Sequence, residues 1–311
     1  MKKRIKMIAL VLVITLLLAF AGGYGGYRLY EYYFSPLPYL AFEINLAANC
    51  AGLAMQFGDE EVMNALRKKT KAFERLAVES LYEQTPMALV NCLRLCELLD
   101  ASTQRDAIYQ IFLERYYNEE TDMFCLLPGR DNAMAWNIAL IFVRDYPQIL
   151  ECDQFSLREG ILRNAPECQL KPPTGEVADM YGSGGAMLEC LSQLSLIDGM
   201  DYSYLIPSNA EEWYAAWEAY EPAGGYEKNY EGLGLVGVSL GKEEKRQYLQ
   251  DIYNNCTVEH AAQISSGGCT YWAANLQYVD HTQNEDFYNA LRARVLELAK
   301  QMNFVRKSFI T

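Results

Sequence analysis

From Pro36 onwards, apolar residues recur at helical spacing along almost the whole chain, and this periodicity limits the possible folds more than any other feature. No segment shows a convincing strand-like alternation of apolar and polar residues. Gly58 is typical of a helix end, while Asp59 and the pair Thr85-Pro86 are typical of helix starts. We therefore expect an all-α body, with helices over residues 39–57, 59–82, 85–99, 102–117, 133–144, 154–163, 180–196, 208–219, 230–240, 242–253, 269–279 and 284–303.

These helices pair into hairpins whose spacing is typical of two-helix repeats. Double glycines precede the first helix of three later pairs, at 184–185, 224–225 and 267–268. In these pairs the first helix is apolar and rich in small residues, whereas the second carries the charge, as in residues 242–246. Apolar helices alternating with charged ones predict an inner ring wrapped by an outer ring, an (α/α)6 toroid of six helical hairpins. An open solenoid is the alternative, and it would need polar caps at two exposed ends. Without a recognisable linker, residues 36–311 form one expected domain.

The first 35 residues predict a targeting segment. Residues 2–6 carry four positive charges, and Met7–Ala21 is an apolar run relieved only by Thr15. No charge follows until Arg28, which leaves an uncharged stretch of 21 residues, near the ~20 that span a bilayer. Tyrosines then cluster, as they do at membrane interfaces. We favour an uncleaved signal anchor, and a cleaved signal peptide is the alternative because Ala19-Phe20-Ala21 has the form of a cleavage site.

The charge distribution fixes the expected location and excludes one class of partner. The positive-inside rule places residues 2–6 in the cytoplasm and the body outside it. The expected location is therefore the cell membrane, single-pass, or a secreted body if the segment is cleaved. The chain has 27 Lys+Arg against 40 Asp+Glu, a net charge of -13, which argues against nucleic acid.

The last 130 or so residues resemble a known family. Residues 224–235 read Gly-Gly-Tyr-Glu-Lys-Asn-Tyr-Glu-Gly-Leu-Gly-Leu, and residues 266–272 and 181–185 are looser copies. This pattern resembles the repeat of terpenoid cyclases and protein prenyltransferase β subunits, in which a Gly-Gly-aromatic loop leads into an inner helix. The resemblance implies the toroid fold alone, because neither the cyclase aspartate motif nor the prenyltransferase zinc ligands has a counterpart. It also prompts the weakest functional alternative, an isoprenoid- or lipid-binding toroid.

Residues just before the inner helices are the candidate site, because helix N-termini in such a ring carry free N–H groups at one end of the cavity. Arg130, Asp131 and Asn132, followed by Trp136, form a hydrogen-bonding group with an aromatic platform suited to a polyhydroxy ligand. Asp131 and Asn132 serve equally well as ordinary helix caps. Further candidate ligand-binding aromatics are Tyr181, Tyr226, Tyr230, Tyr271 and Trp272, all of which are equally compatible with a place in the core.

Four carboxylates could act in glycoside hydrolysis, which needs one acid and one base or nucleophile on opposite sides of the bond. Glu227 and Glu231 are one helical turn apart and share a face, so a productive pair would combine one of them with Asp131 or Asp179. Carboxylates also occur in first helical turns for dipole reasons alone.

The histidine and cysteine content argues against a metal centre or a cofactor. Two histidines exclude a multi-histidine metal site, and no phosphate-loop or dinucleotide motif is present. The nine cysteines include no Cys-x-x-Cys, so we interpret them as small buried residues in preference to structural disulfides, and their odd number leaves at least one thiol free.

Two functional classes follow from these patterns. The first is a membrane-anchored extracytoplasmic ligand-binding or scaffold protein, with a polysaccharide or another protein as the expected partner. The alternative is a carbohydrate-directed enzyme, a glycoside hydrolase or lyase. Whether the chain is an enzyme stays open, but the first class is favoured because no carboxylate pair stands out from helix caps.

Overall fold

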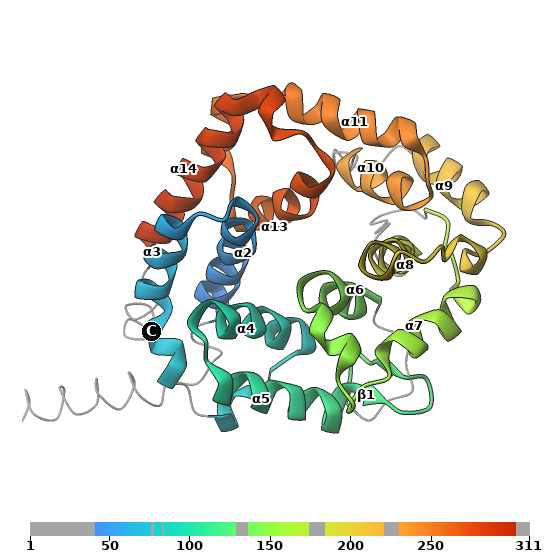
Figure 1. Cartoon of the computed structure of the whole chain (residues 1–311), viewed down its shortest axis with the longest axis horizontal. Coiled ribbons are helices and arrows are strands. Elements are labelled where there is room, and N and C mark those ends of the chain that lie inside the picture. Colours follow the sequence, from blue (N-terminus) through green and yellow to red (C-terminus); the bar gives the residue numbers. More distant parts are fainter. Residues whose placement is uncertain are drawn as a thin grey trace, which may run out of the picture.

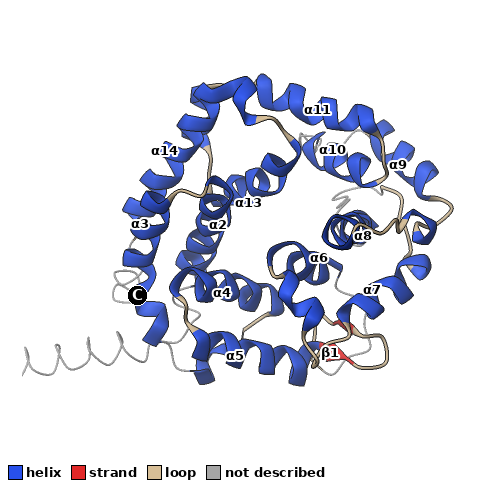
Figure 2. Cartoon of the chain, in the orientation of Figure 1, coloured by secondary structure: helices blue, strands red, loops and turns tan. Residues whose placement is uncertain are grey.

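Helices make up 77% of the chain that the computed structural model describes, namely residues 41–75, 78–82, 84–128, 136–173, 184–220 and 230–302. The expected all-α class is confirmed (Figure 2). The strands found in these ranges are two residues long, β1 (Tyr117–Asn118) and β2 (Met123–Phe124), and they pair antiparallel. Residues 1–35 lie outside the described ranges, and no described helix is long and apolar enough to cross a membrane.

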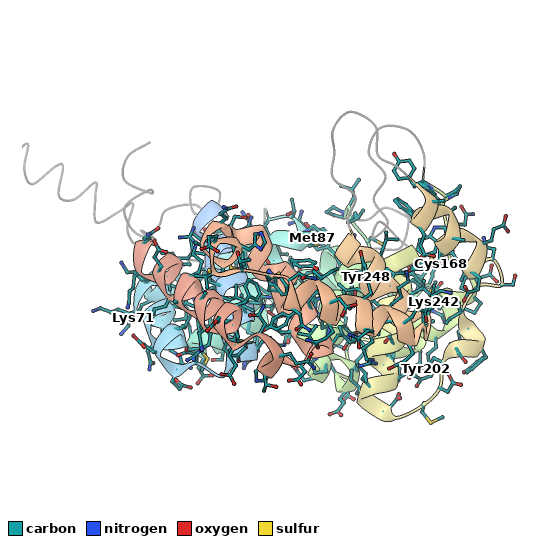
Figure 3. The ribbon with its side chains drawn as sticks, turned by 90° about the horizontal axis from the view of Figure 1, so that it is seen from above. Lys71, Met87, Cys168, Tyr202, Lys242 and Tyr248 are labelled. Carbon is teal, nitrogen blue, oxygen red and sulfur yellow. The ribbon has the colours of Figure 1, made fainter. Side chains whose placement is uncertain are left out.

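The helices form an inner and an outer set (Figure 1). The inner helices are α2 (Ala41–Phe57), α4 (Pro86–Leu99), α6 (Trp136–Asp145), α8 (Gly184–Asp198), α10 (Tyr230–Ser239) and α13 (Ser266–Asn275). The outer helices are α3 (Glu60–Thr70), α5 (Ser102–Ile111), α7 (Leu157–Asn164), α9 (Ala210–Ala219), α11 (Glu243–Asn254) and α14 (Glu285–Gln301). A short helix, α12 (Val258–Gln263), precedes α13. Seen edge-on, the assembly is wide and flat, with Lys71 and Tyr202 toward opposite ends (Figure 3).

Short helical segments fill many of the connections. They are η2 (Lys71–Arg75), η3 (Val78–Leu81), η4 (Phe112–Tyr116, a π-helix), η5 (Pro147–Glu151), η6 (Ala165–Glu167), η7 (Ser203–Leu205), η8 (Leu276–Tyr278) and η9 (His281–Asn284). The predicted single helix over 59–82 is therefore wrong beyond Thr70, where two 3-10 segments replace it. The hydroxyl of Thr70 bonds back to the carbonyl of Leu66, a contact that competes with regular helix continuation.

Local sequence explains several helix boundaries. Asp59 accepts from the main-chain N–H of Glu61 and Val62, at 3.0 and 3.3 Å, and so caps α3. Thr85 accepts from the N–H of Ala88 at 3.3 Å, and Pro86 occupies the first position of α4. Gly58 ends α2 with a φ of 59°, a conformation that a side chain would disfavour. These boundaries agree with those expected from the sequence.

The chain closes on itself because the first hairpin packs against the last. Among inner helices α2 contacts both α4 and α13, while among outer helices α3 contacts α14. Between these ends, α4 contacts α6, α6 contacts α8, and α8 contacts α10. The inner helix α8 is buried on most sides, from Gly184 to Leu191, whereas the outer helix α3 buries only one stripe: Val62, Leu66 and Thr70.

Candidate functional site

Most of the residues predicted to form a site lie outside the described ranges. This holds for Arg130, Asp131, Asn132, Asp179, Tyr181, Tyr226 and Glu227. Tyr230 and Glu231 begin α10, but the structure does not describe their side chains. The pairing of Asp131 or Asp179 with Glu227 or Glu231 therefore stays a prediction.

Three predicted aromatics are described, and all of them are wholly or partly buried. Trp136, the first residue of α6, is 2% exposed. Trp272 of α13 is also buried, with edge-on contacts to Tyr253 and Phe287. Its neighbour Tyr271 is half-buried and meets Trp272 edge-on. Their ring surfaces are thus largely covered by protein, as expected of core residues.

On the inner helices the fold brings together the charged groups Arg94, Arg144, Asp145 and Glu189, which we call the inner ion-pair network. Arg94 of α4 reaches across to α6, where its Nη2 donates to Oδ2 of Asp145. Arg144 donates from Nε to Oδ1 of Asp145 at 2.9 Å, and its Nη1 lies 3.7 Å from Oε1 of Glu189 on α8. Arg94 also lies 3.5 Å from Oδ1 of Asn49 on α2. The network therefore connects four consecutive inner helices.

Asp145 is held ionised within this network. Burial alone would raise its pKa, but the positive charges and hydrogen bonds of Arg144 and Arg94 outweigh burial and lower the pKa to about 2. Both carboxylate oxygens accept hydrogen bonds from arginine. Asp145 thus works as an anchor for two guanidinium groups, and no oxygen of it is left without a donor.

Glu189 differs from Asp145 both in its environment and in the direction of its pKa shift. Glu189 is 1% exposed, and its Oε1 has no hydrogen-bond partner among the described residues. Burial raises the pKa of this carboxyl, Arg144 opposes the rise, and the nearby charge of Asp145 adds to it. Two neighbouring carboxyls therefore have pKa values that their surroundings push in opposite directions.

A second polar contact extends from α8 to the last hairpin. Nε2 of Gln193, one turn after Glu189, donates to the hydroxyl of Tyr278 in η8 at 3.1 Å. Burial and the charge of Glu189 raise the pKa of Tyr278 to about 12, so this phenol stays protonated at physiological pH. The contact joins two inner hairpins that are distant in sequence.

The described surface also holds an open groove between the end of α3, η2 and the end of α4, with a volume of about 510 Å³. Arg67, Lys68 and Lys71 line it together with the acidic residues Glu74, Glu97 and Asp100. Arg67 is already engaged, donating to the carbonyl of Leu98 at 3.0 Å and to Glu60 at 3.1 Å. The groove is therefore lined by as many acidic as basic side chains. No cluster of three or more His, Cys, Asp or Glu suited to a metal occurs in the described part of the chain.

Sequence reasoning missed the inner ion-pair network, although a signal for it exists. Arg94 lies between Leu93 and Leu95, and Glu189 lies between Leu188 and Cys190. Both charges therefore interrupt apolar runs in helices expected to be internal, and buried charges of this kind need partners. The identity of the partners depends on how the hairpins pack, which the sequence pattern does not give.

Comparison of the chain with models of protein families, with curated proteins and with solved structures gave no significant match.

Proposed function

We propose that this chain is a membrane-anchored, extracytoplasmic ligand-binding or scaffold protein whose body is an (α/α)6 toroid. The observation that carries the proposal is the inner ion-pair network, in which the charged groups bind one another. Asp145 accepts hydrogen bonds from two arginines, and Glu189 is almost fully covered. Charges used in this way fix the positions of α4, α6 and α8, and neither carboxylate is presented to a substrate.

The toroid assignment is supported by three features. Two concentric sets of helices alternate along the chain (Figure 1), and the first hairpin packs on the last. Double glycines recur at intervals of 40 and 43 residues, in the first turn of α8 and α13 and shortly before α10. The Gly-Gly-Tyr segment at residues 224–226 resembles the repeat of terpenoid cyclases and prenyltransferase β subunits, and this resemblance concerns the fold alone.

The binding surface, in this proposal, consists of the residues that precede α6, α8 and α10 in the chain. Arg130 and Asn132 supply hydrogen-bonding groups, and Tyr181 and Tyr226 supply aromatic surface, a combination suited to a polysaccharide or a protein partner. The inner ion-pair network fixes the positions of α6 and α8, the helices that follow Arg130, Asn132 and Tyr181 in the chain. The apolar segment Met7–Ala21 anchors the chain in the membrane.

A carbohydrate-directed enzyme is the second candidate, and one observation favours it. The pKa of Asp145 is lowered while that of Glu189 is raised, and such separation is typical of acid–base pairs in active sites. The geometry favours the first candidate, because a general acid must reach the glycosidic oxygen and Glu189 is 1% exposed. A catalytic pair would more reasonably use Asp131 or Asp179 with Glu227 or Glu231.

One experiment separates the two candidates. The full chain in detergent is incubated with a panel of soluble polysaccharides, and both retention on the glycan and release of reducing ends are measured. We expect retention without release, and loss of retention in an R130A/N132A double variant. Release of reducing ends that disappears in D131N or E227Q would establish the enzyme instead. If the chain shows neither retention nor release, the next step is to capture a protein partner by cross-linking.

The membrane anchor needs a separate test. The full chain is expressed beside a matched chain that lacks residues 1–35, and both are fractionated with an alkaline carbonate wash. We expect the full chain to stay in the membrane pellet, with its body degraded by protease added from outside the cytoplasm. Release of the full chain by the wash would contradict an uncleaved anchor.

A further inference from the structure

Two cysteines meet where the first inner helix packs against the last. Cys50 lies on α2 and Cys269 on α13, and both residues are completely buried. The structure records both as free thiols. Because α2 and α13 belong to the first and the last hairpin, a contact between these sulfurs lies at the position where the ring of helices closes (Figure 1).

Small residues explain why the two side chains reach each other. Ala47, Ala51 and Ala54 surround Cys50 on α2 and are all completely buried. The distance between packed helices depends on the side chains at the contact, so these residues let the two backbones approach closely.

The two sulfurs interact directly. The Cys50 thiol donates a hydrogen bond to the sulfur of Cys269, and this bond, together with burial, raises the pKa of Cys50 far above its ordinary value. The same bond lowers the pKa of Cys269 by stabilising its thiolate; burial opposes the fall, and the nearby positive charge of Arg294 adds to it. Arg294 is held in place by the carbonyl of Ile264, at 3.2 Å from its Nε, and by Glu297.

We propose that Cys50 and Cys269 form a disulfide bond in an oxidising compartment and that this bond closes the ring of inner helices covalently. This inference departs from the interpretation of all nine cysteines as simple buried residues, and it concerns this pair alone. It rests on the proposed extracytoplasmic location, which supplies the oxidising compartment, but not on the ligand-binding function, because a closed ring would stabilise a scaffold, a binding protein or an enzyme equally.

The reaction is an exchange with a small-molecule disulfide such as oxidised glutathione. One of the two cysteines loses its proton, and its thiolate attacks one sulfur of that disulfide, so that a mixed disulfide forms while one glutathione thiolate leaves. The other cysteine then loses its proton and attacks the protein sulfur of the mixed disulfide, which expels the second glutathione as a thiolate. The two protons lost by the cysteines are taken up by the two glutathione thiolates. Two protein thiols are oxidised and one glutathione disulfide is reduced to two glutathione molecules. Because both sulfurs are buried in the folded chain, the exchange takes place before α2 and α13 pack together or during their transient separation.

The test is a peptide map of the unmodified full chain. The protein is unfolded and reduced in detergent, refolded with reduced and oxidised glutathione, alkylated and digested without reduction. Trypsin together with a glutamate-specific protease separates Cys269 from Cys256, because Glu259 lies between them. We expect a linked peptide pair that contains Cys50 and Cys269. A refolded, helical protein in which both residues are alkylated, or in which either is linked to another cysteine, would overturn the proposal.

A matched stability measurement gives a second readout. Reductant should lower the unfolding temperature of the oxidised protein by about 10 °C, as expected for a cross-link that closes a long loop. The C50A/C269A double variant should show no shift with reductant. The control is C92A, which removes a completely buried cysteine from the neighbouring inner helix and should keep the full shift. If the double variant does not fold, the peptide map of the unmodified chain still decides the question.

Discussion

The carboxylate of Asp59 joins the first outer helix to the last, because its Oδ2 accepts a hydrogen bond from Nε of Arg292 at 2.9 Å. Its other oxygen, Oδ1, caps α3 through the N–H groups of Glu61 and Val62. Burial would raise the pKa of Asp59, but the hydrogen bonds from Arg292 and from these N–H groups lower it. One side chain therefore both starts α3 and ties it to α14, so that local helix capping and closure of the ring depend on the same residue.

Removing this carboxylate should destabilise the chain through the loss of two separable interactions, the cap of α3 and the ion pair with Arg292. D59N keeps an oxygen that can cap α3 but loses the ion pair with Arg292, so we expect a loss of about 1 kcal/mol in the free energy of unfolding. D59A loses both interactions, and the expected loss is about 2 kcal/mol. Urea denaturation measures both values. The matched control is E243Q, whose carboxylate is highly exposed and lies 3.7 Å from Arg246; an equal effect of D59N and E243Q would contradict a closing role for Asp59.

Asp145 should make the stability of the protein depend on acidity. Its pKa is lowered in the folded chain from 3.8 to about 2, so its stabilising contribution is present above pH 3.8 and is lost as the pH falls toward 2. The shift corresponds to about 2 kcal/mol. We expect D145N to lose at least this amount at pH 7, since it also leaves Arg94 and Arg144 without a counter-charge. Urea midpoints of the wild type and D145N at pH 7 and pH 3 check this, and the difference between them should shrink at pH 3.

Glu189 should give stability the opposite dependence on pH. Its pKa is raised in the folded chain, so the protonated form contributes stability that is fully present below the ordinary value of 4.5 and is lost as the pH rises through the raised value. Glutamine mimics the protonated carboxyl, and we expect E189Q to be as stable as the wild type at pH 7, or more stable by about 1 kcal/mol. A clear loss of stability in E189Q at pH 7 would show that the ionised carboxylate is needed by Arg144.

Much of the secondary structure could be predicted from local chemistry. Gly58, Asp59 and Thr85 mark boundaries that the structure confirms, because capping depends on residues adjacent in sequence. The helix expected to continue to Tyr82 ends instead at Thr70, and α12 was not predicted. The hydrophobic pattern alone revealed neither the end of α3 at Thr70 nor the presence of α12.

The candidate site was less accessible to sequence reasoning. The carboxylates expected to act in a site, such as Asp131 and Glu227, precede the inner helices, because helix N-termini gather at one end of such a ring. Arg94 and Glu189 instead lie within the inner helices, and their importance comes from neighbours on other hairpins. Contacts between hairpins depend on tertiary packing, so the sequence could show that these charges are buried but not which groups pair with them.

Gly160 provides the sharpest test of packing between an outer helix and the β1–β2 turn. A methyl group at this position of α7 would lie 2.1 Å from the main-chain oxygen of Asp122, a separation that the turn cannot relieve by moving a side chain. Asp122 is itself held at a φ of 53° while its carboxylate accepts hydrogen bonds from Tyr117 and Arg163. We therefore expect G160A to lower the free energy of unfolding by about 3 kcal/mol.

The control for this prediction is Gly58, a glycine at the end of α2. Its φ is 59°, but no atom lies within 4 Å of an added methyl group. G58A should therefore suffer only the backbone cost of a left-handed alanine, about 1 kcal/mol. Urea denaturation of both variants separates steric overlap from backbone strain. An added methyl group overlaps a neighbouring atom at Gly160 but not at Gly58. If G160A lowered the free energy of unfolding no more than G58A does, α7 would not pack against the turn as closely as the structure shows.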